Sequence, residues 1–244
     1  MKVTVVIPAY NEEQYIGACL ASVIANGANI HEIIVVNNAS SDNTESVAKS
    51  YPGIHVVTET RKGVTRARQR GIDEATGDII AFIDADTIMP KGWIDDVVRS
   101  FQNRPAMVCI SGPYRYYDST RSQDVLLRAF WWISAPLTYM LVGYMVLGGN
   151  FAAKRSALAA IGGFDTSIDF YGDDTDIARR LHTQGKVLWR MNFNIHTSVR
   201  RFEEEGLLRT NIRYALNFIS VALLNRPFTK KYNDIRIGSK NINK

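Results

Sequence analysis

Two acidic side chains follow a strongly apolar run, and their spacing points to metal chemistry. Residues 80–83 read Ile-Ala-Phe-Ile, and Asp84 and Asp86 come next with one residue between them. Burying a carboxylate without a partner is costly, so acids at the end of a buried strand usually face a cation or a polar ligand. Their hard oxygen atoms favour Mg²⁺ or Mn²⁺, which would bridge the phosphates of a nucleotide. Alternatively, the two acids only cap a helix that starts near Pro90.

A second acidic group opens a predicted helix further along the chain. Asp173, Asp174 and Asp176 fall in its first turn. The helix dipole stabilises acids at this end, so Asp173 can be a simple cap. Two neighbouring carboxylates in a cleft can also tune one of them into a general base. The sequence leaves both roles open, and they can coexist.

The hydrophobic pattern predicts the scaffold that must position these acids. Short β-branched runs alternate with helix-patterned stretches. The predicted pairs are Val3–Ile7 with Glu12–Ala25 after a capping Asn11, Ile33–Val36 with Asn43–Ser50, Ile54–Thr58 with Val64–Ala75, and Asp78–Ile83 with Gly92–Phe101. Repeated strand–helix units predict an α/β fold with a mostly parallel central sheet flanked by helices. Ligands bind at the carboxyl ends of such strands, where Asp84 and Asp86 stand.

Charge is distributed unevenly over the 244 residues. The chain has 29 Lys and Arg against 24 Asp and Glu, a net charge of +5, and residues 200–244 alone hold 10 basic against 4 acidic residues, or +6. Proteins that read nucleic acid usually spread basic residues over a working face, so nucleic acid is not expected as a partner. A basic C-terminal segment behind a near-neutral body instead suits an anionic membrane surface.

The N-terminus and the cysteines favour a cytoplasmic protein. Cys19 and Cys109 lie 90 positions apart in apolar runs, which predicts two buried free thiols in a reducing compartment. The run Val3–Ile7 is too short for the core of a signal peptide. We therefore expect a cytoplasmic location, with peripheral attachment to the inner face of the membrane as an option.

Residues 129–149 carry no charge and are long enough to cross a bilayer. Because acids on both sides of this segment are expected to serve one site, a spanning helix would separate them, and we predict a buried or interfacial segment instead. A final amphipathic helix is predicted over Glu204–Leu224. We expect its apolar stripe, which includes Leu208, Ile212, Leu216 and Ile219, to pack on the protein's own domain.

In these motifs the chain resembles the family 2 glycosyltransferases of the GT-A fold. The resemblance covers roughly residues 3–190 in the expected order and weakens beyond Arg190. It rests on residues 6–13 (VIPAYNEE), 35–44 (VVNNASSDNT), 67–71 (ARQRG), 75–78 (ATGD), 84–86 (DAD), 148–155 (GGNFAAKR), 162–165 (GGFD) and the Asp173-Asp174 helix. Ordered agreement of this kind is far more specific than any single motif.

The resemblance implies an inverting transfer of a sugar from a nucleotide diphosphate, with Mn²⁺ or Mg²⁺ as cofactor. By carry-over onto this sequence, the resemblance implies a nucleoside pocket formed by Pro8, Tyr10 and Glu12, with the base contacted by Asn37 and Arg68. Asp84 would contact the ribose or a metal-bound water, and Asp86 would bind the metal. Asp174 would remove the proton of the acceptor. Asn150 lies in an acceptor-side motif and is expected to bind substrate.

Two positions depart from the family pattern. Asn37 stands where many members have Asp. An aspartate can only accept hydrogen bonds from the base, whereas an amide both donates and accepts them, and uridine stays the expected base. The usual Glu-Asp pair is here Asp173-Asp174, which makes Asp173 a rival base. Alignment with Arg179 and Leu181 favours Asp174.

Three residues late in the chain have less specific roles. A late histidine completes the metal shell in some GT-A enzymes, so His196 is a candidate ligand, although a lone histidine is more often an ordinary surface or packed residue. Arg200 and Arg201 can hold the diphosphate or can pair with the acids at 203–205.

The resemblance also sets the expected organisation and the competing functions. We predict a catalytic domain over residues 1–199, with a nucleotide-sugar half (1–111) and an acceptor half (112–199), followed by a helical extension and tail (200–244). The acceptor is left open between a glycan, a lipid-linked glycan and a protein, with cell-envelope polysaccharide or lipid-linked glycan synthesis as the setting. The alternatives are a sugar-phosphate nucleotidyltransferase and a non-catalytic nucleotide-binding protein. A nucleotidyltransferase would need a glycine-rich loop with a basic residue after the first strand, and residues 8–13 contain neither Gly nor Lys nor Arg.

Overall fold

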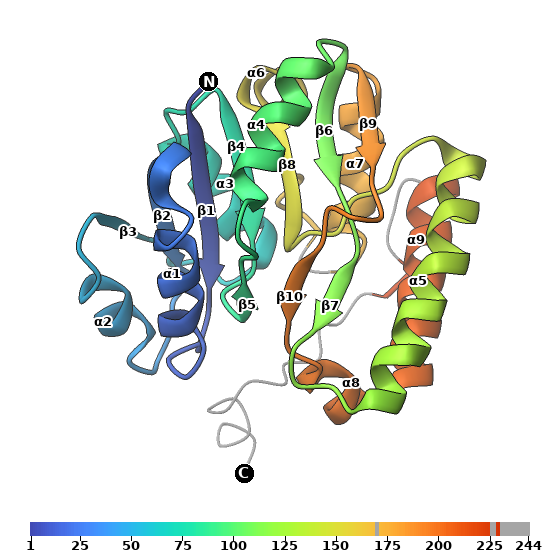
Figure 1. Ribbon diagram of the computed structural model, residues 1–244, viewed down its shortest axis with the longest axis horizontal. Helices are drawn as coiled ribbons and strands as arrows, with labels where there is room; N and C mark the ends of the chain where they lie inside the picture. Colours follow the sequence, from blue (N-terminus) through green and yellow to red (C-terminus); the bar gives the residue numbers. More distant parts are fainter. Residues whose placement is uncertain (169–170, 225–227, 230–244) are drawn as a thin grey trace.

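The computed structural model describes residues 1–168, 171–224 and 228–229. Within these residues one seven-stranded sheet has the order β3-β2-β1-β4-β8-β6-β9 (Figure 1). Its strands are β1 (Val3–Ala9), β2 (Ile30–Asn37), β3 (Ile54–Thr58), β4 (Ile79–Ile83), β6 (Met107–Ser111), β8 (Asn150–Lys154) and β9 (Lys186–Trp189). The predicted α/β class is confirmed.

Pairing within this sheet is mostly parallel. β1 pairs in parallel with β2 and β4, β2 with β3, and β6 with β9, while β8 runs antiparallel between β4 and β6. Asn150, the first residue of β8, lies opposite Ile83, the last residue of β4. The loops after β1, β2 and β4 and the loop before β8 therefore meet at one edge of the sheet.

Helices cover both faces of the sheet because the strands are apolar on both sides. Val5 and Ile7 of β1 pack in one core with α1 (Ile16–Ile24), α2 (Thr44–Lys49) and α4 (Trp93–Asn103). Val6 packs in the other core with α3 (Val64–Glu74), α6 (Arg155–Ala160) and α7 (Asp173–His182). Continuous apolar runs are typical of parallel strands buried on both faces. Cys19 and Cys109 are both buried free thiols, as predicted.

A second, three-stranded sheet extends the binding edge. It has the order β5-β10-β7, formed by Thr87–Ile88, Ile195–Thr197 and Tyr114–Tyr116. β10 pairs antiparallel with β5 and parallel with β7. Because β5 follows directly on the Asp84-Ala85-Asp86 motif, this small sheet brings the late segment around Thr197 beside the two acids.

The first predicted helix begins four residues later than expected. α1 starts at Ile16, not Glu12, after the short turn 13–15. Asn11 does not cap a helix, because it adopts a left-handed conformation (φ 51°) and its side-chain oxygen accepts from the backbone N–H of Ser41 at 2.8 Å. The long-range contact replaces the local cap.

The predicted C-terminal helix is interrupted. α8 (Arg200–Glu205) ends at Gly206, whose φ of 83° breaks the helix, and α9 (Leu207–Leu224) follows. The prediction that its apolar stripe packs inward is wrong: Ile212, Leu216 and Ile219 are exposed. The polar side chain of Asn217 is buried instead, because its amide finds internal partners. The predicted tail lies outside the described residues from 230 onward.

Most of α5 (Arg121–Val142) belongs to the charge-free segment, for which a buried or an interfacial place was predicted. The buried alternative is wrong for α5, and the interfacial alternative stays a prediction. Only 11% of its most apolar 18-residue window is buried. By length and composition α5 is the one helix in the described part of the chain that could span a membrane. A capping box at Thr120 and Gln123 starts it, and Gly143 ends it with a φ of 78°.

Candidate active site

One cavity of about 980 Å³ occupies the binding edge of the sheet. It brings together most of the predicted site residues, which come from five separate segments: Pro8, Tyr10, Glu12, Arg68, Asp84, Asp86, Asp173, Asp174 and Arg200. The acids that follow β4 and the acids of α7 therefore share one chamber, although about 90 residues separate them in sequence.

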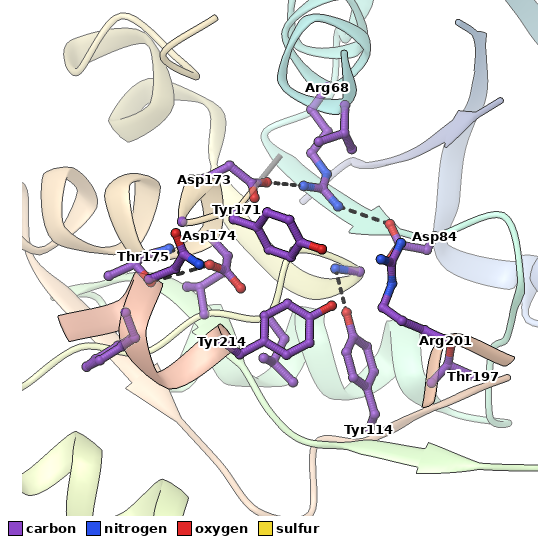
Figure 2. Close-up of a pocket in the computed structure, with 18 of the residues that line it drawn as sticks. Arg68, Asp84, Tyr114, Tyr171, Asp173, Asp174, Thr175, Thr197, Arg201 and Tyr214 are labelled. Atoms are coloured by element: carbon purple, nitrogen blue, oxygen red, sulfur yellow. Dashed lines mark hydrogen bonds and ion pairs between the residues drawn. The ribbon is translucent and has the colours of Figure 1, made fainter. Parts of the chain in front are cut away.

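Arg68 joins the two acidic groups (Figure 2). It projects from α3 and is 5% exposed. One terminal nitrogen donates to Asp84 at 3.0 Å and the other to Asp173. Both carboxylates raise the pKa of this guanidinium, so it stays charged despite its burial. Arg68 thus fixes the spacing between the donor acid and the acceptor acid, a role beyond the predicted base contact.

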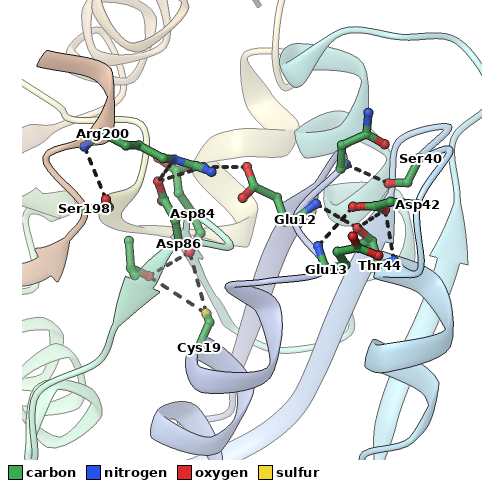
Figure 3. Close-up of polar contacts among 12 residues, drawn as sticks. Glu12, Glu13, Cys19, Ser40, Asp42, Thr44, Asp84, Asp86, Ser198 and Arg200 are labelled. Carbon is green, nitrogen blue, oxygen red and sulfur yellow. Dashed lines mark hydrogen bonds and ion pairs between the residues drawn. The ribbon is translucent and has the colours of Figure 1, made fainter. Parts of the chain in front are cut away.

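Arg200 makes a second bridge on the other side of the motif (Figure 3). Its guanidinium lies 2.9 Å from Asp86 and 2.7 Å from Glu12 and packs over the ring of Tyr15 at 4.5 Å. Burial lowers the pKa of Arg200, but Asp86 and Glu12 outweigh it and the net direction is upward. A cationic group thus already lies between two acids where a metal-bound diphosphate is expected.

The two acids of α7 have different surroundings. Asp173 is 8% exposed and is paired with Arg68, whereas Asp174 is partly exposed and accepts the Thr175 N–H at 2.7 Å. Burial raises the pKa of Asp173 to about 7, although Arg68 opposes that rise, and burial also raises the pKa of Asp174. Only Asp174 combines a raised pKa with a carboxylate that is not tied to an arginine.

Glycine makes the contact between the β8 loop and the acids possible. A Cβ at Gly149 would overlap the carboxylate of Asp84, and one at Gly148 would overlap the guanidinium of Arg68. The Gly149 N–H also donates to the Tyr114 hydroxyl at 2.9 Å. The Gly-Gly pair of the sequence therefore serves close backbone approach.

The structure does not bring three predicted residues to the cavity. Asn37 donates to Glu45 and accepts the Ser40 N–H, so its amide supports the loop after β2. Asn150 is fully buried, where it bonds Trp93 and three backbone carbonyls. His196 lies on β10 between Ile88 and Arg115. Among the described residues around the cavity the walls contain none of the three.

Several wall residues carried no signal in the sequence. Asn38, one position after the predicted Asn37, lines the cavity and holds the backbone of Glu59 and Arg61. Tyr171 and Tyr214 lie on the α7 side of the cavity, and Tyr114 lies on the Asp84 side (Figure 2). The sequence shows three tyrosines among residues 114–117, but no local pattern links them to Asp84.

Comparison with known proteins decides the family. The sequence profile described as Glycosyl transferase family 2 matches residues 4–162. The chain belongs to glycosyl transferase family 2. A relative in this family is the glucosyl-dolichyl phosphate glucuronosyltransferase of Haloferax volcanii, 26% identical over 184 residues, which cover 71% of this chain and 59% of the relative. The chain thus spans less than two thirds of that protein.

Solved structures support the fold of this family 2 member. A mannosyltransferase from Pyrobaculum calidifontis, in complex with GDP-Man and Mn²⁺, superposes with a TM-score of 0.69 at 22% identity, covering 95% of this chain and 65% of that one. Glucosyl-3-phosphoglycerate synthase from Mycobacterium tuberculosis, in complex with Mn²⁺, UDP-glucose and phosphoglyceric acid, gives 0.62 at 25% identity, covering 92% and 79%. The protein has the GT-A fold.

Proposed function

We propose that this protein transfers a sugar from a nucleotide diphosphate sugar, preferably a UDP-sugar, to an acceptor hydroxyl with inversion at the anomeric carbon. The observation that carries the proposal is the Arg68 bridge, which holds Asp84 and Asp173 in one cavity with Asp86 and Asp174. Inverting transfer needs this pairing, because the donor phosphates and the acceptor base must lie on opposite sides of one sugar.

On the donor side, Pro8, Tyr10 and Glu12 form the nucleoside end of the cavity. The predicted cofactor is Mn²⁺ or Mg²⁺, and the residues present fit it: hard carboxylate oxygens line the cavity beside Arg200, while the described residues contain no cluster of three ligands. Such ions are commonly held by one or two carboxylates plus substrate phosphates. Asp86 would hold the ion, whereas His196, the other predicted ligand, is not among the wall residues of the cavity. When bound, the ion neutralises charge on the leaving diphosphate.

On the acceptor side, Asp174 removes the proton from the acceptor hydroxyl as that oxygen attacks the anomeric carbon. The bond between this carbon and the diphosphate oxygen breaks, and the nucleoside diphosphate leaves with the electron pair. Asp173 is the positioning partner, because its contact with Arg68 fixes the start of α7 relative to Asp84. No covalent intermediate is required.

We also propose that the protein works at the cytoplasmic face of a membrane. The support is the apolar outer side of α5, where Trp132, Ile133, Met140 and Leu141 are between 66% and 81% exposed. The basic segment at 200–244 adds charge of the sign that anionic lipids attract. Sedimentation with vesicles tests this point, and binding should weaken when Met140 and Leu141 are both changed to Glu.

The decisive experiment is a panel of nucleotide sugars with Mn²⁺, read by release of nucleoside diphosphate. Transfer of sugar releases a nucleoside diphosphate, whereas nucleotidyl transfer from a nucleoside triphosphate releases pyrophosphate. Measuring both products therefore separates the proposed activity from that of a sugar-phosphate nucleotidyltransferase. Metal-dependent nucleotide binding with no product of either kind, across a set of acceptors, would favour a non-catalytic nucleotide-binding protein.

A further inference from the structure

The outer surfaces of α5 and α9 are apolar. On α5 the exposed side chains include Phe130, Trp132, Ile133, Leu137 and Met140, which are between 40% and 81% exposed. On α9 they include Ile212, Leu216 and Ile219. The two helices lie at the same edge of the molecule (Figure 1). Apolar surface of this extent is unusual for a helix pair that faces water.

One side of α9 carries polar residues that contact the segment before α7. Arg213 donates to the Tyr171 hydroxyl and to Glu205, both at 2.9 Å, and Asn217 is 1% exposed. Tyr171 stands two residues before Asp173. The helix is therefore held by polar contacts to the segment that carries the α7 acids. Ile212 and Leu216 face outward, and Ile219 lies where the cavity opens to the surface.

The active-site cavity continues between these two helices. We call the α5–α9 arm the part of the cavity lined by Phe130, Leu141 and Val142 of α5 and by Phe218, Ile219 and Ala222 of α9. The same cavity contains Asp174 and Tyr214. Ser134, Thr138 and Asn211 also line this part, so the arm is a mostly apolar groove that runs from Asp174 to the apolar edge of the molecule.

The position of the acids shows how α5 can meet a membrane. Asp84 precedes α5 in the chain and Asp173 follows it, yet both contact Arg68. Both ends of α5 therefore belong to one body on one side of the bilayer. A helix in this position can lie along a leaflet but cannot cross it.

We infer that the α5–α9 arm binds the hydrocarbon chain of a lipid-linked acceptor, whose polar head presents the reacting oxygen to Asp174. The inference rests on the proposed function and names its acceptor class. The continuity of the arm with the catalytic acids selects this occupant, because a second protein covering the outer face would leave a mostly apolar groove to Asp174 without a use. The leaflet contact lets the lipid enter without crossing water.

The test compares two ligands with the same head and different chains. Dodecyl phosphate, below its micelle-forming concentration, and propyl phosphate are titrated into the full chain by calorimetry. Wild type should bind the dodecyl compound at least tenfold more tightly. Ala222→Trp, which fills the arm, should lose at least tenfold of that affinity, and Ala215→Trp, at another wall position, is the second variant. Ile212→Trp is the matched control, because Ile212 is exposed on α9 and is not a wall residue.

Binding of UDP with Mn²⁺ is measured on every variant. It should be unchanged, which shows that the variants fold. Equal affinity of wild type for the two phosphates, or full dodecyl phosphate affinity in both wall variants, would overturn the inference and leave the proposed function standing. Failure of wild type to bind UDP with Mn²⁺ would count against the proposed function. The comparison of dodecyl with propyl phosphate would still show whether the α5–α9 arm binds a hydrocarbon chain. A dimer that Leu137→Glu dissociates would assign the outer face to a second copy and contradict the inference.

Discussion

The donor end of the cavity and the α5–α9 arm are built from opposite kinds of side chain. At the donor end Arg68 and Arg200 each bridge two carboxylates within 3.0 Å. In the arm, Phe130, Leu141 and Phe218 offer only apolar surface. The donor end is thus held by paired charges in partly buried positions, where ion pairs are sensitive to the loss of one partner.

Under the proposed assignment, donor and acceptor are recognised by different physics within one chamber. Charge pairing would fix geometry at the donor end, whereas the arm would select by shape and apolar area, which is tolerant of chemical detail. Substitutions at the donor end should therefore affect nucleotide binding and chemistry, and substitutions in the arm should affect the acceptor alone.

The largest effect is expected at Asp86. Replacing Asp86 by Asn removes the carboxylate that would join the metal-bound diphosphate to the protein, so metal-dependent nucleotide binding and transfer should be lost together. Calorimetry with UDP and Mn²⁺ and a turnover assay measure the two losses. Asp73→Asn, on the exposed side of α3, is the matched control and should behave as wild type. Normal nucleotide binding by Asp86→Asn would remove Asp86 from the donor end.

Asp174→Asn should separate chemistry from donor binding. The amide keeps the size of the side chain but cannot accept a proton, so kcat should fall by about 10²–10⁴, the usual cost of losing a general base. Donor affinity should stay near wild type. Asp173→Asn should cost less, since it perturbs the Arg68 bridge and the start of α7. If Asp173→Asn loses more activity than Asp174→Asn, the base is Asp173. If both variants keep full activity, the two acids only cap the helix.

The pH profile sharpens the same assignment. Burial raises the pKa of Asp174 above the ordinary value of 3.8, and a base works only when ionised. The single-turnover rate should therefore fall as pH drops through that raised pKa, with an acidic limb that lies above pH 3.8. The residual rate of Asp174→Asn should lack this limb. If the pH profile of Asp174→Asn keeps the same acidic limb as wild type, that limb reports the ionisation of another base.

Arg200→Gln tests whether the donor end depends on charge pairing. The change leaves Asp86 and Glu12 close together without their bridging cation. With a chelator present to remove metal ions, the free energy of unfolding should fall by about 3 kcal/mol, the lower end of the range for breaking a buried ion pair. Mn²⁺ should restore part of this stability in the variant more than in wild type. Thermal melts with and without Mn²⁺ measure both effects, and Arg99→Gln at an exposed pair is the control. Equal melting of Arg200→Gln and wild type would show that the bridge contributes nothing.

The smallest effect is expected at Asn37. UDP should bind better than guanosine diphosphate, and Asn37→Leu should weaken UDP binding by about 1–3 kcal/mol by leaving polar partners unpaired. Because Asn37 bonds Glu45 and Ser40, the loss can act through the loop after β2. Calorimetry with both nucleotides, together with urea unfolding, separates a base contact from a loop contribution. A preference for guanosine would contradict the uridine assignment.

Local patterns carried much of the fold. The bounds of β3 agree with the predicted run at 54–58, because β-branched residues between turn residues are a local signal. The acids at 84 and 86 were placed correctly at the carboxyl end of β4, since strand ends follow from the same pattern. The resemblance to a known family supplied the functional interpretation, which hydrophobic periodicity alone does not contain.

Other elements depended on contacts that no local pattern contains. α1 begins at Ile16, and the residues before it are placed by a long-range contact in which the Glu12 N–H donates to the Thr44 hydroxyl at 2.7 Å. The direction in which α9 faces was predicted wrongly, because Arg213 finds Tyr171 far away in the sequence. An amphipathic pattern shows that two faces differ but does not say which one meets the protein.

The sequence by itself determined the alternation of strands and helices, the two acidic motifs and the strand end at which the first motif lies. Tertiary structure alone decided that Arg68 joins the two motifs, that Arg200 bridges Asp86 and Glu12, and that the apolar side of α9 faces outward. The physical reason is range. Strand and helix patterns arise between residues a few positions apart, whereas an ion pair between residues 68 and 173 exists only after the sheet has brought its loops to one edge.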